Sequence, residues 1–287
     1  MAEFGIRVRL RTVSRKGCGF ESHLWHHVMN LKYSLGLRLA PKTYLLAQLL
    51  ILIGLSLSFT SASSIWLNLL VAWLVAILLE LILNAAGKKI VHLPDAALIS
   101  ATIIVGVLAS STPTPIIALV VAISILAKHF VHYKGKHIFN PANLGILLAV
   151  FILGQNAEWW VASNVFAIVG LGLFVMYKIR RLLTPIIFLT LYFLLLFVTT
   201  SDIHLEFIKN SLVADFSIYF FAFIMLPEPQ TAAWTSKGRY INSGLTATIG
   251  VILSLLQVKA PLIVALATTN LLTPLVNNYT KTKKYEN

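Results

Sequence analysis

The stretch IWLNLLVAWLVAILLELILNAAGKK, Ile65 to Lys89, decides the class of this chain. It is a continuous apolar segment with one carboxylate, Glu80, and it ends in two lysines. A helix needs about 20 apolar residues to cross the hydrocarbon core of a bilayer, and lysines beside such a segment are typical of its cytoplasmic end. The stretch therefore predicts a membrane-spanning helix.

Further apolar segments follow the same pattern along the chain. We place ten in all, near 43–59, 65–86, 96–110, 114–127, 141–154, 159–177, 182–199, 211–226, 241–257 and 260–277. Several of them, such as 96–110 and 141–154, are short, so we expect half-helices, broken helices or tilted spans packed inside protein. The composition agrees, because 58% of the residues are hydrophobic, 11% are charged and the mean hydropathy is +0.84. The chain is expected to be an all-α integral membrane protein with about ten transmembrane helices.

The basic residues predict how the chain is oriented. From Met29 onward, sixteen Lys and Arg residues fall in alternate loops, and only Lys209 and Lys259 fall in the others. Positive residues gather in cytoplasmic loops. Both termini are therefore expected in the cytoplasm, with the loops 87–95, 128–140, 178–181 and 227–240. We expect a multi-pass protein of the bacterial cytoplasmic (inner) membrane.

The net charge of +13 comes from basic residues in short loops beside apolar segments, where lipid headgroups and membrane topology account for them. We therefore do not expect the chain to bind nucleic acid. The single cysteine, Cys18, excludes disulfides within the chain and cysteine-ligated iron–sulfur clusters. All eight histidines fall in loops or at their edges, so no pair is placed to hold a haem inside the membrane. We assign no catalytic residue and no metal ligand.

The segment 1–28 differs from the rest, because it is basic, contains the cysteine and has no apolar run. It lacks the apolar region of a signal peptide. Two interpretations stay open. The segment is a basic cytoplasmic tail, or it is an artefact of the gene model, since GCGFESH at Gly17–His23 resembles the translation of a transfer-RNA T-arm and Met29 provides an ordinary start. Residues 29–287 are expected to form a single polytopic membrane domain.

Ten spans divide into two sets of five, about 43–154 and about 159–277. An odd number of spans in each half makes the second half enter the membrane in the opposite direction, which predicts an inverted repeat. Each half contains a short apolar segment that ends in prolines, Asp95–Pro115 on the outer side and Asp215–Thr231 on the inner side. Such breaks normally face protein or a water-filled cavity. The alternative is that both are simple loops with turn-forming prolines.

A third break, Lys134–Val150, contains Asn140 followed by Pro141, which predicts a helix that begins at this proline. The free N–H groups of such a helix would point toward the cytoplasm, and the basic residues before it would favour an anion such as a phosphate.

Three stretches resemble the NqrB/RnfD family, the membrane subunits of sodium-translocating NADH:quinone reductase and of the Rnf electron-transport complex. They are KHIFNPANLG at 136–145, FAFIMLPEPQTAAWTSKGRYI at 221–241 and LLTPLVNN at 271–278. The resemblance covers most of 43–278. The chain is also similar to short stand-alone RnfD-like proteins. It implies ten transmembrane helices in an inverted repeat with a urea-transporter-like architecture. It also implies partner subunits that oxidise NAD(P)H or ferredoxin.

The resemblance implies a flavin, FMN or riboflavin, with quinone as a further candidate. Family members in the full complexes carry FMN esterified to a threonine, but the corresponding stretch Gly154–Phe166 has none, which argues against a covalent flavin here. A non-covalent one would be held by residues of the motifs, which are Asn140, Pro141, Asn143, Glu228, Thr231, Lys237 and Arg239. Glu228 departs from the family's usual Thr-Asp-Pro, and Lys237 and Arg239 are equally well explained as topology determinants.

Two functions follow from these observations. The first is a membrane subunit of a flavin- or quinone-linked electron-transport system, which couples electron transfer to movement of Na⁺ or H⁺. The alternative is a transporter or channel without redox chemistry for a small solute, such as a flavin precursor or a urea-like molecule.

Overall fold

The apolar segments and the helices coincide along the chain. The computed structural model describes residues 41–58, 64–87, 94–133, 136–199 and 215–280. Within these ranges each expected segment contains a helix. The helices are α2 (Pro41–Leu57), α3 (Ser64–Ala86), α4 (Asp95–Val107), α5 (Thr114–Phe130), α6 (Pro141–Phe151), α7 (Val165–Lys178), α8 (Leu183–Thr199), α10 (Ser217–Phe220) continued by the π-helical η2 (Phe221–Met225), α11 (Ser236–Leu255) and α12 (Pro261–Tyr279). The described strands are only β1 (His132–Tyr133) and β2 (Lys136–His137), an antiparallel pair, so the all-α class is confirmed.

The helices differ in length as the sequence predicts. Among the described helices, α3 alone is long and apolar enough to cross a membrane by itself. The short helices α4 and α6 have 13 and 11 residues, which correspond to lengths of about 20 Å and about 17 Å.

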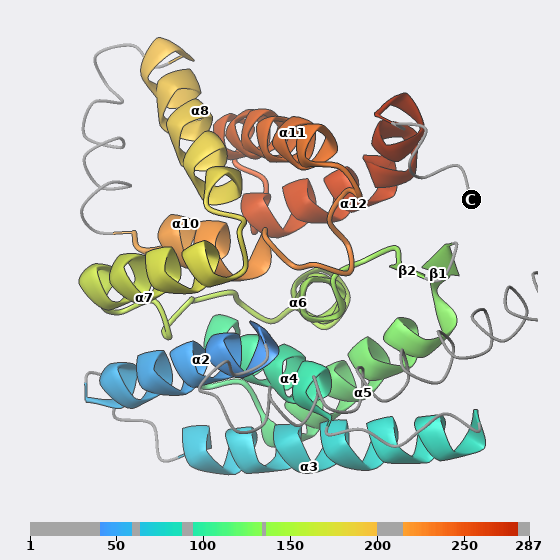
Figure 1. Ribbon diagram of the computed structural model, residues 1–287. Coiled ribbons are helices and arrows are strands. Elements are labelled where there is room, and N and C mark those ends of the chain that lie inside the picture. Colours follow the sequence, from blue (N-terminus) through green and yellow to red (C-terminus); the bar gives the residue numbers. More distant parts are fainter. Residues whose placement is uncertain (1–40, 59–63, 88–93, 134–135, 200–214, 281–287) are drawn as a thin grey trace, which may run out of the picture. The chain divides into compact units, whose positions relative to one another are not determined.

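Helices of the same half pack together. The described residues from Tyr44 onward form one compact unit. The expectation for residues 1–28 concerns a segment outside the described ranges. In the first half α3 packs against α4 and α5, and α5 packs against α6. In the second half α8 packs against α11, and α11 packs against α12. Figure 1 shows α6 lying between the two groups, where it contacts α12.

The C-terminal end of α4 is closed by the segment that precedes α7. The last carbonyl groups of a helix have no partners within it, and α4 ends inside the protein. The carbonyl of Val107 accepts bonds from the backbone N–H groups of Glu158 and Trp159, at 2.9 Å and 3.0 Å. The indole of Trp160 donates to the carbonyl of Val105 at 2.8 Å. This use of residues 158–161 explains why α7 begins at Val165 and not near 159.

The second short helix, α10 with η2, ends in the same way against protein. Asn140 donates from Nδ2 to the carbonyl of Met225 at 3.3 Å, and Arg181 donates from its guanidinium to the carbonyl of Pro227 at 3.1 Å. The π-helical turn is wholly buried. Gly172 of α7 allows this turn to approach closely, because a Cβ at Gly172 would lie 2.6 Å from the ring of Phe223. Both proline-rich breaks therefore lie against protein in the described part of the chain.

One helix begins earlier than expected. The sequence placed a span at 241–257, but α11 starts at Ser236, because the Thr235 side chain accepts a hydrogen bond from the Gly238 backbone N–H at 2.9 Å. This N-cap adds a polar first turn to the helix, which brings Lys237 and Arg239 onto α11.

Candidate functional site

A cleft lined by arginines lies between the start of α11 and the turn that joins α7 to α8. It has a volume of about 290 Å³. Its lining residues are Tyr177, Arg180, Arg181, Leu182, Leu183, Thr184, Ser236, Arg239 and Tyr240. The volume is at the lower end of the range for small-molecule sites, and the two tyrosines offer rings against which a planar group could stack.

The turn after α7 has a backbone geometry that places two arginines at this cleft. The backbone N–H of Arg181 bonds to the carbonyl of Met176 at 2.9 Å, and that of Arg180 bonds to the carbonyl of Tyr177 at 3.2 Å. These are the two bonds of a Schellman motif, whose left-handed position usually holds glycine. Here Arg180 occupies it, with φ of +57°. The left-handed conformation costs an arginine about 1 kcal/mol, and strain of this kind is often found at functional sites.

The cleft has an excess of positive charge. Burial and, to a lesser extent, the positive charge of Arg239 together lower the pKa of Arg181 to about 10, and Glu228 opposes the change. Arg181 therefore remains charged at neutral pH but lies beside a like charge. The N-terminus of α11 adds the positive end of a helix dipole. An anion with several oxygens, such as a phosphate, would relieve this repulsion and bind the guanidinium groups.

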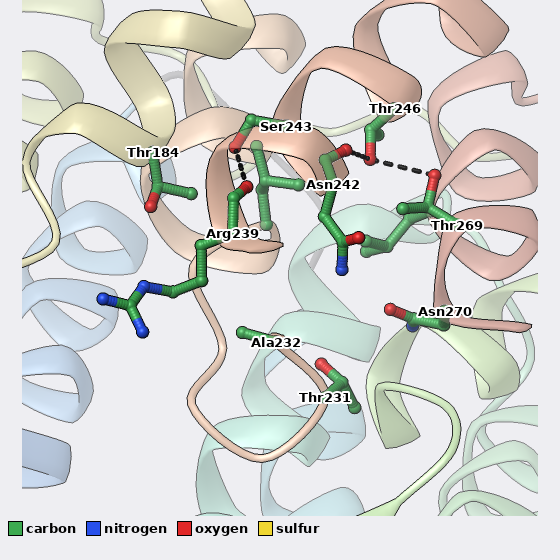
Figure 2. A pocket seen from close by; sticks show the side chains of 11 residues that line it. Thr184, Thr231, Ala232, Arg239, Asn242, Ser243, Thr246, Thr269 and Asn270 are labelled. Carbon is green, nitrogen blue, oxygen red and sulfur yellow. Dashed lines mark hydrogen bonds between the residues drawn. The ribbon is translucent and has the colours of Figure 1, made fainter. Parts of the chain in front are cut away.

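A narrow cavity continues inward from the cleft. It has a volume of about 10 Å³ and shares Thr184 and Arg239 with the cleft. Figure 2 shows Asn242 of α11 and Asn270 of α12 facing this space, with Thr231 on the loop before α11. The walls are rich in hydroxyl and amide groups, and the Thr246 hydroxyl lies 3.0 Å from that of Thr269 (Figure 2).

A third cavity, of about 30 Å³, is lined in part by the same loop before α11. It shares Thr231, Ala232 and Asn270 with the narrow cavity. Its lining residues are His137, Ile138, Gln230, Thr231, Ala232, Trp234, Asn270, Thr273, Pro274 and Asn277. All except Asn270 belong to the three stretches 136–145, 221–241 and 271–278. Segments far apart in the sequence thus meet around one cavity.

The expected ligand-binding residues separate into two groups. Thr231 and Arg239 line the cavities, and Glu228 is joined to them because it accepts a bond from the Thr231 hydroxyl at 3.2 Å. Arg239 donates to the carbonyl of Trp234 and to the hydroxyl of Ser236, at 3.3 Å and 2.8 Å. Its neighbour Lys237 lies 5.7 Å from the ring of Tyr279, and it lines none of the three cavities.

The residues at the start of α6 join helices together. Asn140 caps α6 by accepting a bond from the Asn143 backbone N–H at 3.0 Å. The carbonyl of Pro141 accepts a bond from the hydroxyl of Ser124. Asn143 is fully buried and donates to the carbonyl of Ile263 at 3.0 Å. The expected helix start at Pro141 is confirmed, and the side chains of Asn140 and Asn143, which were expected to contact a ligand, bond to protein groups instead.

Sequence reasoning missed Arg180, Arg181 and Thr184 as site residues. The two arginines were counted as topology determinants, and a signal was present in their adjacency directly after an apolar segment. Thr184 gave no signal of its own, because one threonine near the start of an apolar helix is ordinary.

Comparison of the chain with protein-family models and with characterised proteins finds no match. The assignment of a function therefore depends on the residues and their geometry.

Proposed function

We propose that the chain is a membrane subunit of a flavin- or quinone-linked electron-transport system, similar to the NqrB/RnfD family. In this proposal it lies in the bacterial cytoplasmic membrane with both termini in the cytoplasm. It works with a separate subunit that oxidises NAD(P)H or ferredoxin, and it couples electron transfer to movement of Na⁺ or H⁺. The ligand is a non-covalent FMN, whose phosphate binds in the arginine-lined cleft.

The distribution of polar side chains supports a membrane location. On α12 the buried face carries Thr269, Asn270 and Thr273, while Leu271 and Leu275 on the opposite face are 57% and 65% exposed. On α3 a row of large apolar residues is at least half exposed, comprising Trp66, Leu67, Leu70, Leu74, Leu78 and Ile82. Polar residues inside and apolar residues outside are expected when the surrounding solvent is lipid.

The helix contacts support two repeats. The pairs α3–α5 and α5–α6 of the first half correspond in order to α8–α11 and α11–α12 of the second half. The short helices α4 and α10–η2 take equivalent positions, and each leads into a proline-containing segment. Within the described residues each half has five helical segments, and an odd number agrees with an inverted repeat.

The observation that carries the proposal is the convergence around the third cavity. Three stretches that resemble one family line it together, although more than a hundred residues separate the first from the last. The arginine-lined cleft is linked to this cavity by the narrow cavity, which shares lining residues with both. A phosphate-bearing ligand at the cleft would thus contact the region in which the resemblance is concentrated.

Flavin binding by matched variants tests the proposal. Arg239→Gln and Lys237→Gln remove the same charge from the same helical turn, but only Arg239 lines the cleft. A charge-assisted hydrogen bond contributes about 1.5–3 kcal/mol, so Arg239→Gln should weaken FMN binding roughly tenfold to a hundredfold, and Lys237→Gln should leave it unchanged. Riboflavin, which lacks the phosphate, should bind both variants and the unaltered protein equally.

The measurement is equilibrium binding of each flavin to the detergent-purified protein, followed by fluorescence quenching. Equal affinities for FMN and riboflavin in the unaltered protein would exclude a phosphate site. Equal losses in the two variants would show that the cleft does not hold the phosphate. Extraction of membranes with alkaline carbonate tests the membrane location, because an integral protein stays in the pellet.

The second candidate is a solute transporter without redox chemistry. The row of small cavities with hydroxyl and amide walls and the lack of threonine in Gly154–Phe166 favour it. It requires uptake of a small neutral solute by proteoliposomes in the absence of any electron donor. Absence of uptake over a panel of urea-like and flavin-precursor solutes would remove it.

A further inference from the structure

Four buried polar atoms without hydrogen-bond partners among the described residues lie along the row of cavities. They are Thr184 Oγ1, Asn242 Oδ1, Asn270 Nδ2 and His137 Nδ1. Thr184 lines both the cleft and the narrow cavity, and Asn242 lines the narrow cavity. Asn270 lines the narrow and the third cavity, and His137 lines the third. The four atoms thus mark a path from the cleft to His137.

A buried polar atom without a partner is costly, and nearly all such atoms in native proteins are bonded to protein or to ordered water. Buried atoms of this kind gathered along one path indicate that the path is occupied. The protein groups that line it do not supply these bonds, so the partner is a molecule held in the cavities.

The volumes of the cavities and the hydrogen-bond donors and acceptors that line them indicate which kind of molecule they hold. A cavity of about 10 Å³ has room for about one water molecule, and one of about 30 Å³ for about two. A bare cation is disfavoured, because the Asn270 amide donor and the Arg239 guanidinium line the same narrow space. An anion there would meet the Asn242 carbonyl oxygen. Water donates and accepts, so it satisfies donors and acceptors alike.

We propose that the three cavities form one hydrated passage, in which ordered water molecules link the arginine-lined cleft to His137 beneath the loop 227–235. The narrow part, of about 10 Å³, has room for about one water molecule. The passage therefore brings water to the inner end of the cleft, where the Thr184 hydroxyl lies. This inference does not depend on the flavin, because it uses only the unpartnered atoms and the cavities.

Hydroxyl-radical footprinting tests the passage, since radicals formed from bound water modify the side chains beside it. Leu266 and Leu262 lie one turn apart on α12 and are 3% and 5% exposed. Only Leu266 lines the narrow cavity. We expect several-fold faster modification of Leu266 than of Leu262 in the detergent-purified protein. Equal rates for the two leucines would overturn the proposal.

The thermal midpoint of the Thr184→Val variant is a second test, because a hydrated cavity and a dry cavity predict changes of opposite sign. Replacing an unpartnered hydroxyl by a methyl group of the same shape raises the thermal midpoint if the hydroxyl is dry, and lowers it if water is bonded there. Thr248→Val on α11 is the control, because the Thr248 hydroxyl donates to the carbonyl of Gly244 at 3.0 Å. We expect Thr184→Val to lower the midpoint and to slow the labelling of Leu266. A raised midpoint with unchanged labelling would refute the hydrated passage.

Discussion

Glu80 of α3 forms a buried ion pair whose removal has a calculable cost. Its carboxylate lies 2.6 Å from Lys128 Nζ and 3.0 Å from His129 Nε2, both on the last turn of α5. The side chains of the pair are 11% exposed. Glu80 lies near the C-terminal end of its apolar segment, where a charged side chain is easier to accommodate than in the middle.

Glu80→Leu leaves the Lys128 ammonium buried without its partner. Breaking a buried pair costs about 3–5 kcal/mol, and the lower end applies here because lysine can extend its amine toward water. A loss of about 3 kcal/mol corresponds to roughly a 150-fold fall in the folding equilibrium constant. The double variant Glu80→Leu with Lys128→Leu should recover most of this loss, since apolar replacement of both partners is often close to neutral.

Unfolding by SDS in mixed micelles, followed by circular dichroism, measures these free energies. Glu158→Leu is the control, because this exposed carboxylate has a weaker contact, at 3.4 Å from the Ser110 N–H, and should change stability by less than about 0.5 kcal/mol. If Glu80→Leu changes stability no more than Glu158→Leu does, and the double variant shows additive effects, the pair is solvated and the reasoning fails.

Three further predictions concern packing, capping and pH. Gly172→Ala should destabilise the protein by about 2 kcal/mol, because the added Cβ would lie 2.6 Å from the Phe223 ring. Gly170→Ala is the control and should be neutral or slightly stabilising, because no atom lies within 4 Å of its added Cβ. Equal effects of the two substitutions in thermal unfolding would contradict the packing. Asn140 and Asn164 both cap helices with hydrogen bonds of 3.0 Å, but only Asn140 also bonds to Met225. Asn140→Ala should therefore lower the free energy of unfolding by about 1 kcal/mol more than Asn164→Ala in the same assay. No difference between the two variants would exclude a stabilising bond between α6 and η2. Burial, with charge on His132 and Lys128, lowers the pKa of His137 from 6.5 to about 4. Stability should therefore be complete above about pH 6.5 and fall by about 1–2 kcal/mol as the pH drops toward 4. His137→Gln should remove this decline, and an equal decline in that variant would contradict the prediction.

The helices could be predicted from the sequence because each one coincides with an apolar segment. The short lengths of α4 and α6 were also predictable, since a run of apolar residues ends where the next proline or polar cluster begins. Boundaries were less accurate where tertiary contacts replace helical bonds. The start of α7 moved to Val165 because residues 158–161 bond to the end of α4. The start of α11 moved to Ser236 because Thr235 caps a polar first turn that hydropathy does not detect.

The candidate site was predicted in part. Thr231 and Arg239 lie at the cavities, but the asparagines that begin α6 are occupied in joining helices. The difference has a physical reason. An asparagine after a basic loop suits a helix cap, a ligand contact or a bond between helices equally well, and only its neighbours in space decide which of these it makes.

By itself, the sequence determined the all-α class and, within the described residues, the helical segments and their approximate ends, because hydrophobic length and proline act locally along the chain. The tertiary structure alone decided which positively charged side chains lie close together. Arg181 and Arg239 are far apart in sequence and meet only because the Schellman turn after α7 faces the first turn of α11. Lys237, two residues from Arg239, lies instead beside Tyr279. Charge can be counted along a chain, but a binding site depends on distances between side chains, and those distances are set by how the helices pack.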